Sequence, residues 1–485
     1  MTRASRPMTT MNSSKPFSTL PMTRQPTGPC WTPGAQPPPH RTAHGMRLRT
    51  SLCTRGCWRR HDPLGILLHR RGEPTQPPAC DRGSRGGRVA PQGQPLSAPA
   101  NSFAPRSVAV MNYFYDEVRS PEALIDRYRS TNGVWEAVAR DGVEVTVFQR
   151  FGSAATIDHR GVRYQFVADR QQTILPAWMY PRALHHAAVA AECDVYHINS
   201  YFPLQSAILR RQIRASAAIV HQDHAALPRT GLRRLWDRAL LRHADGFVFV
   251  SGLQGAPWAE AGVIRSPDLV HEAMEGSTGF TPERTGKQTP GGMEGDPTVL
   301  WVGRLNHNKD PLVALAGFRE ALRDNPRARL YIIAHETDLA DAVRAQIEAD
   351  SLQDAVQMPG AFPHEAMEDW YRAADYFLLG SHKEGSGFAL AEAMACGVVP
   401  VVTDIPSFRK MTGDGRAGYL WEPGNAASCA AALRRAFAQP RDEGSRAARA
   451  QFEAHLSFDA IARDLLKAYG AAVERRLYQK ATRPS

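Results

Sequence analysis

Long apolar runs and cysteines are both scarce in this sequence. No stretch approaches the roughly 18 apolar residues that a membrane-spanning helix needs, so the sequence predicts no such helix. Seven cysteines occur in 485 residues, and the three that follow residue 105, Cys193, Cys396 and Cys429, stand among Ala, Met and Val. Cysteines in such surroundings are typically buried and reduced, which favours a cytoplasmic location.

Acidic residues are nearly absent from the start of the chain. Residues 1–105 contain 15 of the 59 Lys and Arg residues but 3 of the 48 Asp and Glu residues, so the net charge of +11 belongs to this segment. The segment also holds 17 of the 36 prolines and lacks a sustained apolar period. These features predict a disordered, basic, Pro- and Arg-rich tail over residues 1–105. The rest of the chain is close to neutral, so no specific nucleic-acid partner is expected.

After the tail, short apolar runs alternate with stretches of helical period. In the first half the sequence predicts strands at 108–112, 144–148, 194–198, 217–221 and 246–250. Helices are predicted between them, including 133–140, 204–212 and 231–242. A stretch rich in Pro, Gly and charge follows and predicts a linker over residues 283–297.

The second half repeats the alternation. Strands are predicted at 299–302, 330–333, 356–358, 376–379 and 399–402, and helices at 311–323, 339–349, 365–374, 388–396 and 426–437. Continuous apolar strands joined by helices indicate parallel sheets covered on both faces. The sequence thus predicts an α/β protein with two doubly wound, Rossmann-like domains facing a cleft. The domains would span 106–282 and 298–455, followed by a helix and tail in 456–485.

Polar and glycine residues follow several predicted strands, at the edge where open parallel sheets bind ligands. Four groups fall just after strand ends: Arg304 and Lys309, Gly360 and Phe362, Ser381 and Glu384, and, in the first domain, Asp223 and His224. We therefore expect each domain to contribute its group of side chains to one site.

The turn Gly385-Ser386-Gly387 comes directly before a predicted helix that begins at Phe388. Free amides and the dipole at the start of a helix favour an anion. Two further cations, Arg304 and Lys309, would suit a diphosphate leaving group whose negative charge grows as its bond breaks. No acidic cluster suited to Mg²⁺ stands nearby, so we expect cationic side chains in place of a metal.

Two carboxylates, Glu384 and Glu392, flank the start of this helix. Eight residues of helix span about 12 Å, so the two can bind distant hydroxyls of one ligand. The simpler interpretation is that Glu384 complements the helix start and Glu392 faces solvent. Ala and Met residues on both sides of Glu392 favour burial instead, and a buried carboxylate needs partners.

These residues resemble the retaining glycosyltransferases of the GT-B fold, in glycosyltransferase family 4. The family pattern E-G-x-G-x-x-x-x-E-A-M-A-x-G matches Glu384-Gly-Ser-Gly-Phe-Ala-Leu-Ala-Glu392-Ala-Met-Ala-Cys-Gly397. The family's upstream Gly-Arg and Lys match Gly303-Arg304 and Lys309. The resemblance covers roughly residues 298–440.

The resemblance implies that Arg304 and Lys309 hold the diphosphate of a nucleotide-sugar donor and that Glu392 binds its ribose. It implies that Glu384 contacts the donor sugar, with the amides of Gly385, Ser386, Gly387 and Phe388 near the sugar and phosphate. It further implies transfer of a hexose to a hydroxyl acceptor with retention of configuration, without a required cofactor or metal. The acceptor class stays open between a glycan, a lipid-linked molecule and a small molecule.

The first half matches the family more weakly. Val220–His224 resembles the segment whose His lies near the reacting sugar, which makes His224 the preferred candidate and His221 the competing one. The stretch Met274–Phe280 matches the family's Asn-Gly-Val-Asp only loosely. Two alternatives therefore remain: a catalytically silent nucleotide-sugar-binding protein, and a GT-B sugar-nucleotide epimerase, which does not need the paired Glu residues.

A helical stripe of apolar residues, Leu232, Leu235, Trp236, Ala239 and Leu240, is flanked by arginines in the predicted helix 231–242. A basic amphipathic helix of this kind can dock on a membrane surface, which would make the protein peripheral to the membrane. The simpler expectation is an ordinary surface helix whose Leu face packs inward.

Overall fold

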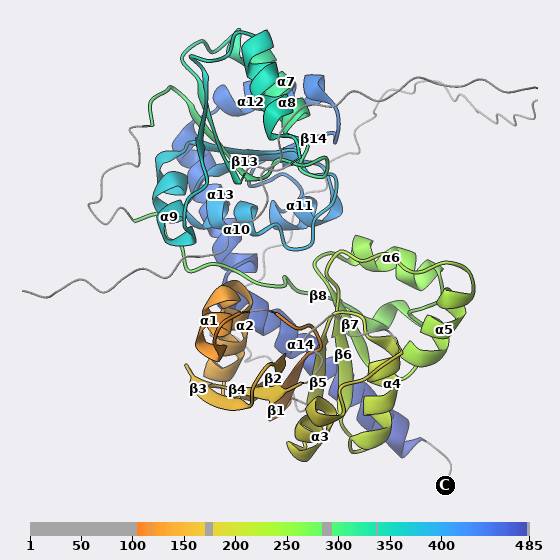
Figure 1. The fold of residues 1–485 in the computed structure, drawn as a ribbon. Helices are drawn as coiled ribbons and strands as arrows, with labels where there is room; N and C mark the ends of the chain where they lie inside the picture. The colour runs from red at the N-terminus through yellow and green to blue at the C-terminus, as the bar shows by residue number, and fades with distance from the viewer. Residues whose placement is uncertain (1–103, 117, 170–177, 284–292, 336–337, 483–485) are drawn as a thin grey trace, which may run out of the picture. The chain divides into compact units, whose positions relative to one another are not determined.

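The computed structural model describes residues 104–116, 118–169, 178–283, 293–335 and 338–482. They belong to one compact unit, residues 92–485, and form two sheets, each packed between helices (Figure 1). The predicted tail lies outside the described residues except at its last two positions, and so do residues 284–292 of the predicted linker.

The N-terminal sheet has eight strands in the order β3-β4-β2-β1-β5-β6-β7-β8. Its strands are β1 (Ser107–Asn112), β2 (Glu144–Phe151), β3 (Ala155–His159), β4 (Val162–Ala168), β5 (Val195–Asn199), β6 (Ala218–Gln222), β7 (Gly246–Phe249) and β8 (Val270–Glu272). All neighbours are parallel except β3 and β4. All five strands predicted for this half are present, within one to three residues at each end.

The predicted strands omitted β3, β4 and the short β8. β3 is an edge strand of alternating half-buried and exposed residues, so it lacks the continuous apolar run of its neighbours. The two residues between β3 and β4, Arg160 and Gly161, both have positive φ. This is the geometry of a tight hairpin turn, in which glycine is favoured.

Helices α1 (Pro121–Arg127), α2 (Arg129–Arg140), α3 (Arg182–Ala190), α4 (Pro203–Gln212), α5 (Gly231–Leu241) and α6 (Gly252–Glu260) belong to the N-terminal sheet. A single 3₁₀ turn, η1 (Pro267–Leu269), precedes β8. The long last helix α14 (Phe458–Ala481) also packs here, against α2, β6 and β7. The hydroxyl of Tyr469 lies 2.9 Å from His197 Nδ1, so the end of the chain is tied to the first sheet.

Helix α5 corrects the expectation that its Leu face packs inward. Leu232 is 77% exposed and Trp236 is 66% exposed, whereas the helix buries Asp237 and Leu241. Asp237 forms an ion pair with Arg229 in the preceding loop. The inward side of α5 is thus occupied by a paired carboxylate and one Leu, and the apolar stripe faces outward.

The C-terminal sheet has six parallel strands in the order β11-β10-β9-β12-β13-β14. They are β9 (Thr298–Arg304), β10 (Arg329–His335), β11 (Val356–Gly360), β12 (Tyr376–Leu379), β13 (Val399–Thr403) and β14 (Tyr419–Trp421). The helices are α7 (Pro311–Leu322), α8 (Ala340–Ala349), α9 (His364–Ala373), α10 (Phe388–Ala395), α11 (Pro406–Met411), α12 (Ala426–Phe437) and α13 (Arg441–His455). All five predicted strands and all five predicted helices of this half are present; α11, α13 and β14 were not predicted.

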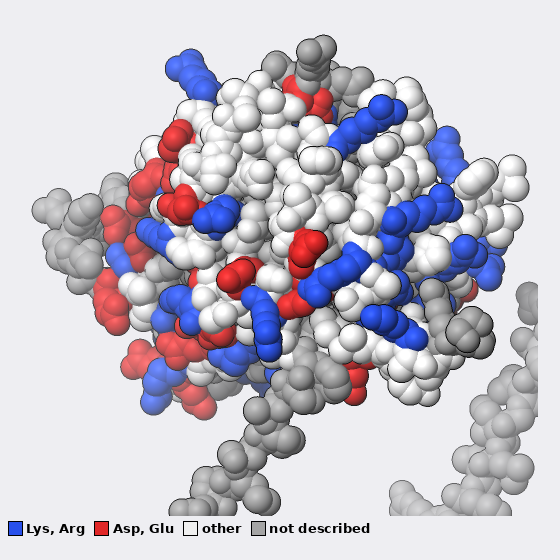
Figure 2. Space-filling model, turned by 90° about the horizontal axis from the view of Figure 1, so that it is seen from below, with Lys and Arg blue, Asp and Glu red and all other residues white. Residues whose placement is uncertain are grey.

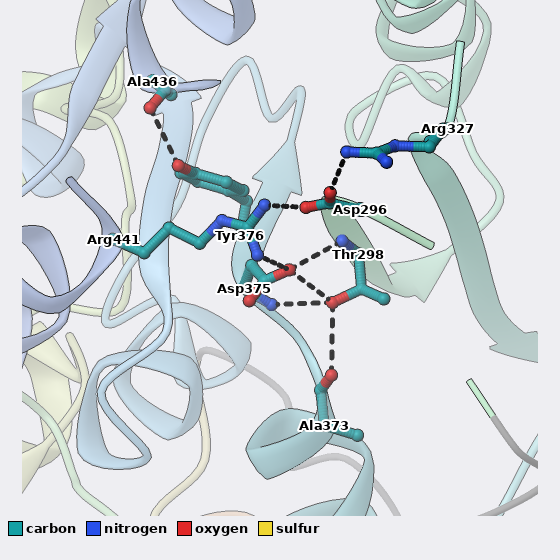
Figure 3. A network of polar contacts seen from close by, with 8 residues as sticks. All are labelled: Asp296, Thr298, Arg327, Ala373, Asp375, Tyr376, Ala436 and Arg441. Carbon is teal, nitrogen blue, oxygen red and sulfur yellow. Dashed lines mark hydrogen bonds and ion pairs between the residues drawn. The ribbon is translucent and has the colours of Figure 1, made fainter. Parts of the chain in front are cut away.

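The amino ends of β9 and β12 are joined by a polar network, drawn in Figure 3. The Asp375 carboxylate accepts hydrogen bonds from the amide of Thr298 at 2.8 Å and from its hydroxyl at 2.9 Å. Arg441, at the start of α13, pairs with both Asp375 and Asp296. This network fixes the two central strands at the edge opposite their carboxyl ends.

Candidate active site

A pocket of about 600 Å³, here called the C-domain pocket, lies at the carboxyl ends of β9, β10 and β11. Its walls include Arg304, Lys309, His335, Phe362, His364 and Glu392. β9 runs two residues beyond its predicted end, so Arg304 is its last residue and stands in register with His335. Among the residues that the structure describes, Arg304 has no ion-pair partner.

Lys309 lies in the turn between β9 and α7, where its amide donates to the Asn306 side chain at 3.0 Å. Its ammonium group forms an ion pair with Glu384, and the two side chains are 20% and 13% exposed. The backbone carbonyl of Glu384 accepts a hydrogen bond from Gln254 of α6 at 2.9 Å. The predicted cation and the predicted carboxylate therefore meet directly.

Glu392 lies in the second turn of α10 and is 8% exposed, so the interpretation that it faces solvent is wrong. One carboxylate oxygen lies 2.9 Å from His364 Nε2, and the other accepts from the Tyr371 hydroxyl at 2.9 Å. The hydrogen bond to Glu392 is the main cause that raises the pKa of His364 above 6.5. Helix α9 thus supplies both partners that the buried carboxylate requires.

The start of α10 is formed by Gly387 in the left-handed region, with φ of 54°, and no side chain caps the helix. A Cβ at this position would stand 2.8 Å from the Phe408 ring, so both the backbone conformation and the space favour glycine. The uncapped amides of the first turn are the group that an anion would complement.

The remaining predicted residues of this domain differ in their placement. Phe362 packs against Trp370, with ring centroids 4.9 Å apart, and lines the C-domain pocket. Gly360 ends β11 with φ of 97°. It forms the turn after this strand and does not line the C-domain pocket. Ser381 is fully buried and does not line the C-domain pocket.

A second pocket, of about 390 Å³, is here called the N-domain pocket. Its polar lining includes Asn112 at the end of β1, Asn199 at the end of β5, and His224 two residues beyond β6. Glu275 and Phe388 also line it, so α10 contributes its first residue to this pocket and Glu392, in its second turn, to the C-domain pocket. Apolar and aromatic side chains of α1, α2, β2 and β4 also line it: Leu124, Ile125, Trp135, Val147, Tyr164 and Phe166.

Both ring nitrogens of His224 have oxygen partners. Nδ1 lies 2.7 Å from the Glu275 carboxylate, and Nε2 lies 2.6 Å from the side-chain oxygen of Asn199. The side chain is 38% exposed, and desolvation of its ring disfavours the charged form, but the hydrogen bond and charge of Glu275 and the charge of Asp223 outweigh this effect and raise the pKa of His224 above 6.5.

The competing candidate, His221, lies inside β6 and is fully buried. Its Nε2 lies 2.9 Å from the Ser206 hydroxyl and its Nδ1 lies 3.2 Å from the Ser200 carbonyl. Burial lowers the pKa of His221 to about 4. Asp223 is also buried, and its carboxylate accepts from the Ala226 amide at 3.0 Å within the β6 loop. Of these three residues, His224 is the one that lines the N-domain pocket.

Within the described part of the chain, no group of three His, Cys, Asp or Glu side chains is placed to hold a metal ion. The same residues contain no helix long and apolar enough to cross a membrane. Cys193, Cys396 and Cys429 are buried and free.

Two family models match this sequence: "Glycosyltransferase Family 4" over residues 131–271 and "Glycosyl transferases group 1" over residues 284–452. The GDP-mannose:cellobiosyl-diphosphopolyprenol alpha-mannosyltransferase of Xanthomonas oryzae pv. oryzae is 34% identical over 310 residues, which cover 59% of this chain and 76% of that protein. The chain belongs to glycosyltransferase family 4.

Another relative matches this glycosyltransferase over part of its sequence, and two solved structures share its fold. A D-inositol 3-phosphate glycosyltransferase of Kineococcus radiotolerans is 30% identical over 226 residues, 42% of this chain and 51% of that protein. A glycosyltransferase of Rickettsia africae superposes with a TM-score of 0.58 at 15% identity, over 76% of this chain and 98% of that one. Sucrose-phosphate synthase of Thermosynechococcus elongatus superposes with a TM-score of 0.55 at 19% identity, over 77% of this chain and 100% of that one. The predicted GT-B fold is thereby confirmed.

The sequence did not predict several residues that line the pockets of this glycosyltransferase or contact a lining side chain. His364 and Tyr371 hold Glu392, and Asn199 and Glu275 hold His224. His364 stands one residue before the predicted helix 365–374 and is the first residue of the observed helix α9. Glu275 lies in the stretch that matches the family only loosely, and nothing in its neighbours indicates a contact with a residue 51 positions away.

Proposed function

We propose that this chain is a retaining glycosyltransferase that moves a hexose from a nucleotide-diphosphate sugar to a hydroxyl acceptor without needing a metal. The observation that carries the proposal is the C-domain pocket, which Arg304, Lys309 and Glu392 of α10 line, together with the uncapped start of the same helix. Two cations and free amides suit a diphosphate, and a buried carboxylate suits a ribose diol.

In the proposed reaction, the acceptor oxygen forms a bond to the anomeric carbon while the bond from that carbon to the diphosphate oxygen breaks. Arg304 and Lys309 would stabilise the negative charge that grows on the leaving diphosphate. The acceptor proton would pass to the departing phosphate oxygen, so the protein supplies positioning and charge rather than a nucleophile. Retention rests on the resemblance of the Glu384–Glu392 segment, and metal independence rests on the two cations.

The test is a panel of UDP-, GDP- and ADP-linked hexoses, scored by thermal stabilisation and then by sugar release with and without EDTA. We expect one nucleotide to raise the melting temperature and its sugar to be released with EDTA present, with α-configured product. Arg304→Gln should abolish both. Nucleotide-sugar binding without sugar release would favour the catalytically silent alternative. Conversion of the nucleotide sugar to an isomer would favour the epimerase. Loss of activity in EDTA would contradict metal independence.

For the acceptor, we propose a lipid-linked hydroxyl compound. The relative with 76% coverage is named for a diphosphopolyprenol acceptor. In addition, helix α5 begins nine residues after Gln222, where β6 ends beside the N-domain pocket. An enzyme that takes such an acceptor must meet it at a membrane surface, and α5 offers a face suited to that contact.

The exposed face of α5 is apolar at its centre and basic at its sides. Residues of a helix lie 100° apart, so Leu232, Leu235 and Trp236 point within about 60° of the direction opposite to the buried Asp237 and Leu241. Leu227, in the preceding loop, is also exposed. Four large exposed apolar side chains in one short segment form a patch of the kind that marks a contact with a membrane or a partner.

The charges around this face are all positive. Arg233, Arg234, Arg238 and Arg242 have no ion-pair partner within the described residues, and Asp237, the one acid of the helix, is buried. Arg242 also lines a pocket of about 340 Å³ with Arg265 and Arg476. Figure 2 shows Lys and Arg side chains spread over the right half of the face, with few acidic ones, while acidic side chains gather on the left. We propose that α5 docks on an anionic bilayer.

Flotation of the whole chain with phosphatidylglycerol vesicles tests this docking. We expect co-flotation that weakens as salt rises, and at least about a tenfold loss in the double variant Leu235→Ser/Trp236→Ser, since each side chain gains about 1.5–3 kcal/mol on burial. Trp178→Ser, which removes an exposed Trp elsewhere, is the matched control, and the basic tail is the same in all variants. Equal loss in the control, or no flotation of the unaltered chain, would contradict the proposal.

A further inference from the structure

Glu275 connects the β6 loop with the turn before α10, beside the N-domain pocket. It lies in the segment after β8, and its amide donates to the Ser386 hydroxyl at 2.6 Å. Its carboxylate lies 2.7 Å from Nδ1 of His224. One residue therefore bonds the turn before α10 through its backbone and the β6 loop through its side chain.

The second carboxylate oxygen of Glu275, Oε1, is buried and has no hydrogen-bond partner among the described residues. A Cβ at position 385 would stand 2.2 Å from this oxygen, a distance that no real Cβ contact reaches. Gly385 thus lies against the Glu275 carboxylate. This carboxylate stands next to the Gly385–Phe388 turn, whose amides are predicted to lie near the sugar and phosphate.

The hydrogen-bond partners of His224 favour its charged form. Asn199 directs its amide nitrogen to the side-chain oxygen of Asn112 at 3.0 Å, which leaves its oxygen for Nε2 of the ring. Glu275 presents an oxygen to Nδ1. This placement of an acceptor at each nitrogen favours a ring that donates from both, which is an imidazolium cation.

We propose that Glu275 is a positioning residue that holds His224 as a cation with Nε2–H aimed at the N-domain pocket, and that ties this ring to the Gly385–Phe388 turn. The inference rests on the proposed function, because the ring then stands ready to donate to an oxygen of the transferred sugar in place of Asn199. Glu275 acts through His224 and through the turn, so it touches neither the sugar nor the leaving group itself.

The charges facing His224 agree with this arrangement. Asp223 precedes it on the β6 loop and Glu275 faces it from the segment after β8, and both favour the charged ring over the effect of burial. The nearby ring of His197 on β5 is fully buried, and burial lowers the pKa of His197 to about 3. His197 is therefore neutral at physiological pH and does not oppose a charge on His224.

The first experiment is a histidine NMR titration of the unaltered chain and of Glu275→Gln, with the His224 signal assigned by its loss in His224→Asn. Gln keeps the size and an acceptor oxygen but removes the charge. We expect the pKa of His224 to lie above 6.5 in the unaltered chain and to fall in Glu275→Gln. A value at or below 6.5 in the unaltered chain would overturn the proposal by itself, even if the variant does not fold.

The second experiment compares transfer rates across pH, with the nucleotide sugar that stabilises the chain best. We expect kcat to fall as pH rises through the raised pKa of His224, and Glu275→Gln to move this fall to lower pH with little change in donor KM. Glu272→Gln is the matched control, because Glu272 pairs with Lys410 of α11 but does not contact His224. An unmoved pH profile, or the same shift in the control, would refute the role of Glu275. Failure to transfer from any nucleotide sugar, with the NMR shift intact, would refute the proposed function alone.

Discussion

Replacing Glu384 by Gln is expected to strengthen nucleotide binding while it weakens sugar transfer. Lys309 is paired with Glu384, so a diphosphate must compete with this carboxylate for the ammonium group. Gln keeps the shape of the side chain and removes its charge. The nucleotide then gains a free cation, whereas the sugar loses the carboxylate proposed to contact it.

The magnitude follows from the partial burial of the pair. Two unit charges about 4 Å apart interact by about 4 kcal/mol at the effective dielectric constant of a site near the surface. Lys309 and Glu384 are 20% and 13% exposed, so water screens part of this attraction. A nucleotide recovers only some of the remainder, because its own phosphates must be desolvated. A net gain of about 1–2 kcal/mol corresponds to roughly 5–30-fold tighter binding.

Calorimetric titration with UDP, GDP and ADP measures this gain without any contribution from the sugar. The same variant should lower the rate of sugar release from the matching nucleotide sugar by about 10²-fold or more. Glu365→Gln is the matched control, because Glu365 is a carboxylate at the start of α9 that pairs with Arg129 instead of Lys309.

Two outcomes would refute this reasoning. Weaker binding of the free nucleotide to Glu384→Gln would mean that the carboxylate orients Lys309 for the phosphate rather than competing with it. An equal gain in Glu365→Gln would mean that any lost negative charge near the pocket has the same effect, and the ion pair would not be its cause.

Two further predictions concern the partners of Glu392. Tyr371→Phe removes one donor from the buried carboxylate and should lower the free energy of unfolding by about 2 kcal/mol in a urea titration; an unchanged value would mean that another donor replaces the hydroxyl. Because Glu392 raises the pKa of His364 above 6.5, the stabilisation from this pair should be complete below that pH and lost as pH rises through the raised pKa. The difference in unfolding free energy between the chain and His364→Gln, followed from about pH 5 to 9, measures it, and a difference independent of pH would contradict the assignment.

The strands that carry the site could be predicted because a parallel sheet with helices on both faces requires apolar residues at nearly every strand position. β12 and β13 satisfy this requirement with fully buried runs. β3 could not be predicted in the same way, because an edge strand needs only one apolar face. Residues just beyond the strands, such as Lys309 and Glu384, were then assigned to one sheet edge by the topology of the fold.

The choice between His221 and His224 needed the tertiary structure. His221 lies inside β6 and His224 lies two residues beyond its end. The hydrogen bond of Ser206 to the His221 ring and the N-domain pocket beside the His224 ring distinguish the two. The orientation of α5 needed it too, because an amphipathic pattern defines an apolar face but not whether that face meets the core or the solvent.

The sequence by itself determined the two alternating domains, the family resemblance and four lining residues of the C-domain pocket, Arg304, Lys309, Phe362 and Glu392, since these depend on local spacing and on strand ends. Only the tertiary structure decided which groups pair across long separations: Lys309 with Glu384, Glu392 with Tyr371, and His224 with Glu275. The physical reason is that a charge or a hydrogen bond acts over a few ångströms in space. The fold, rather than the spacing along the chain, sets those distances.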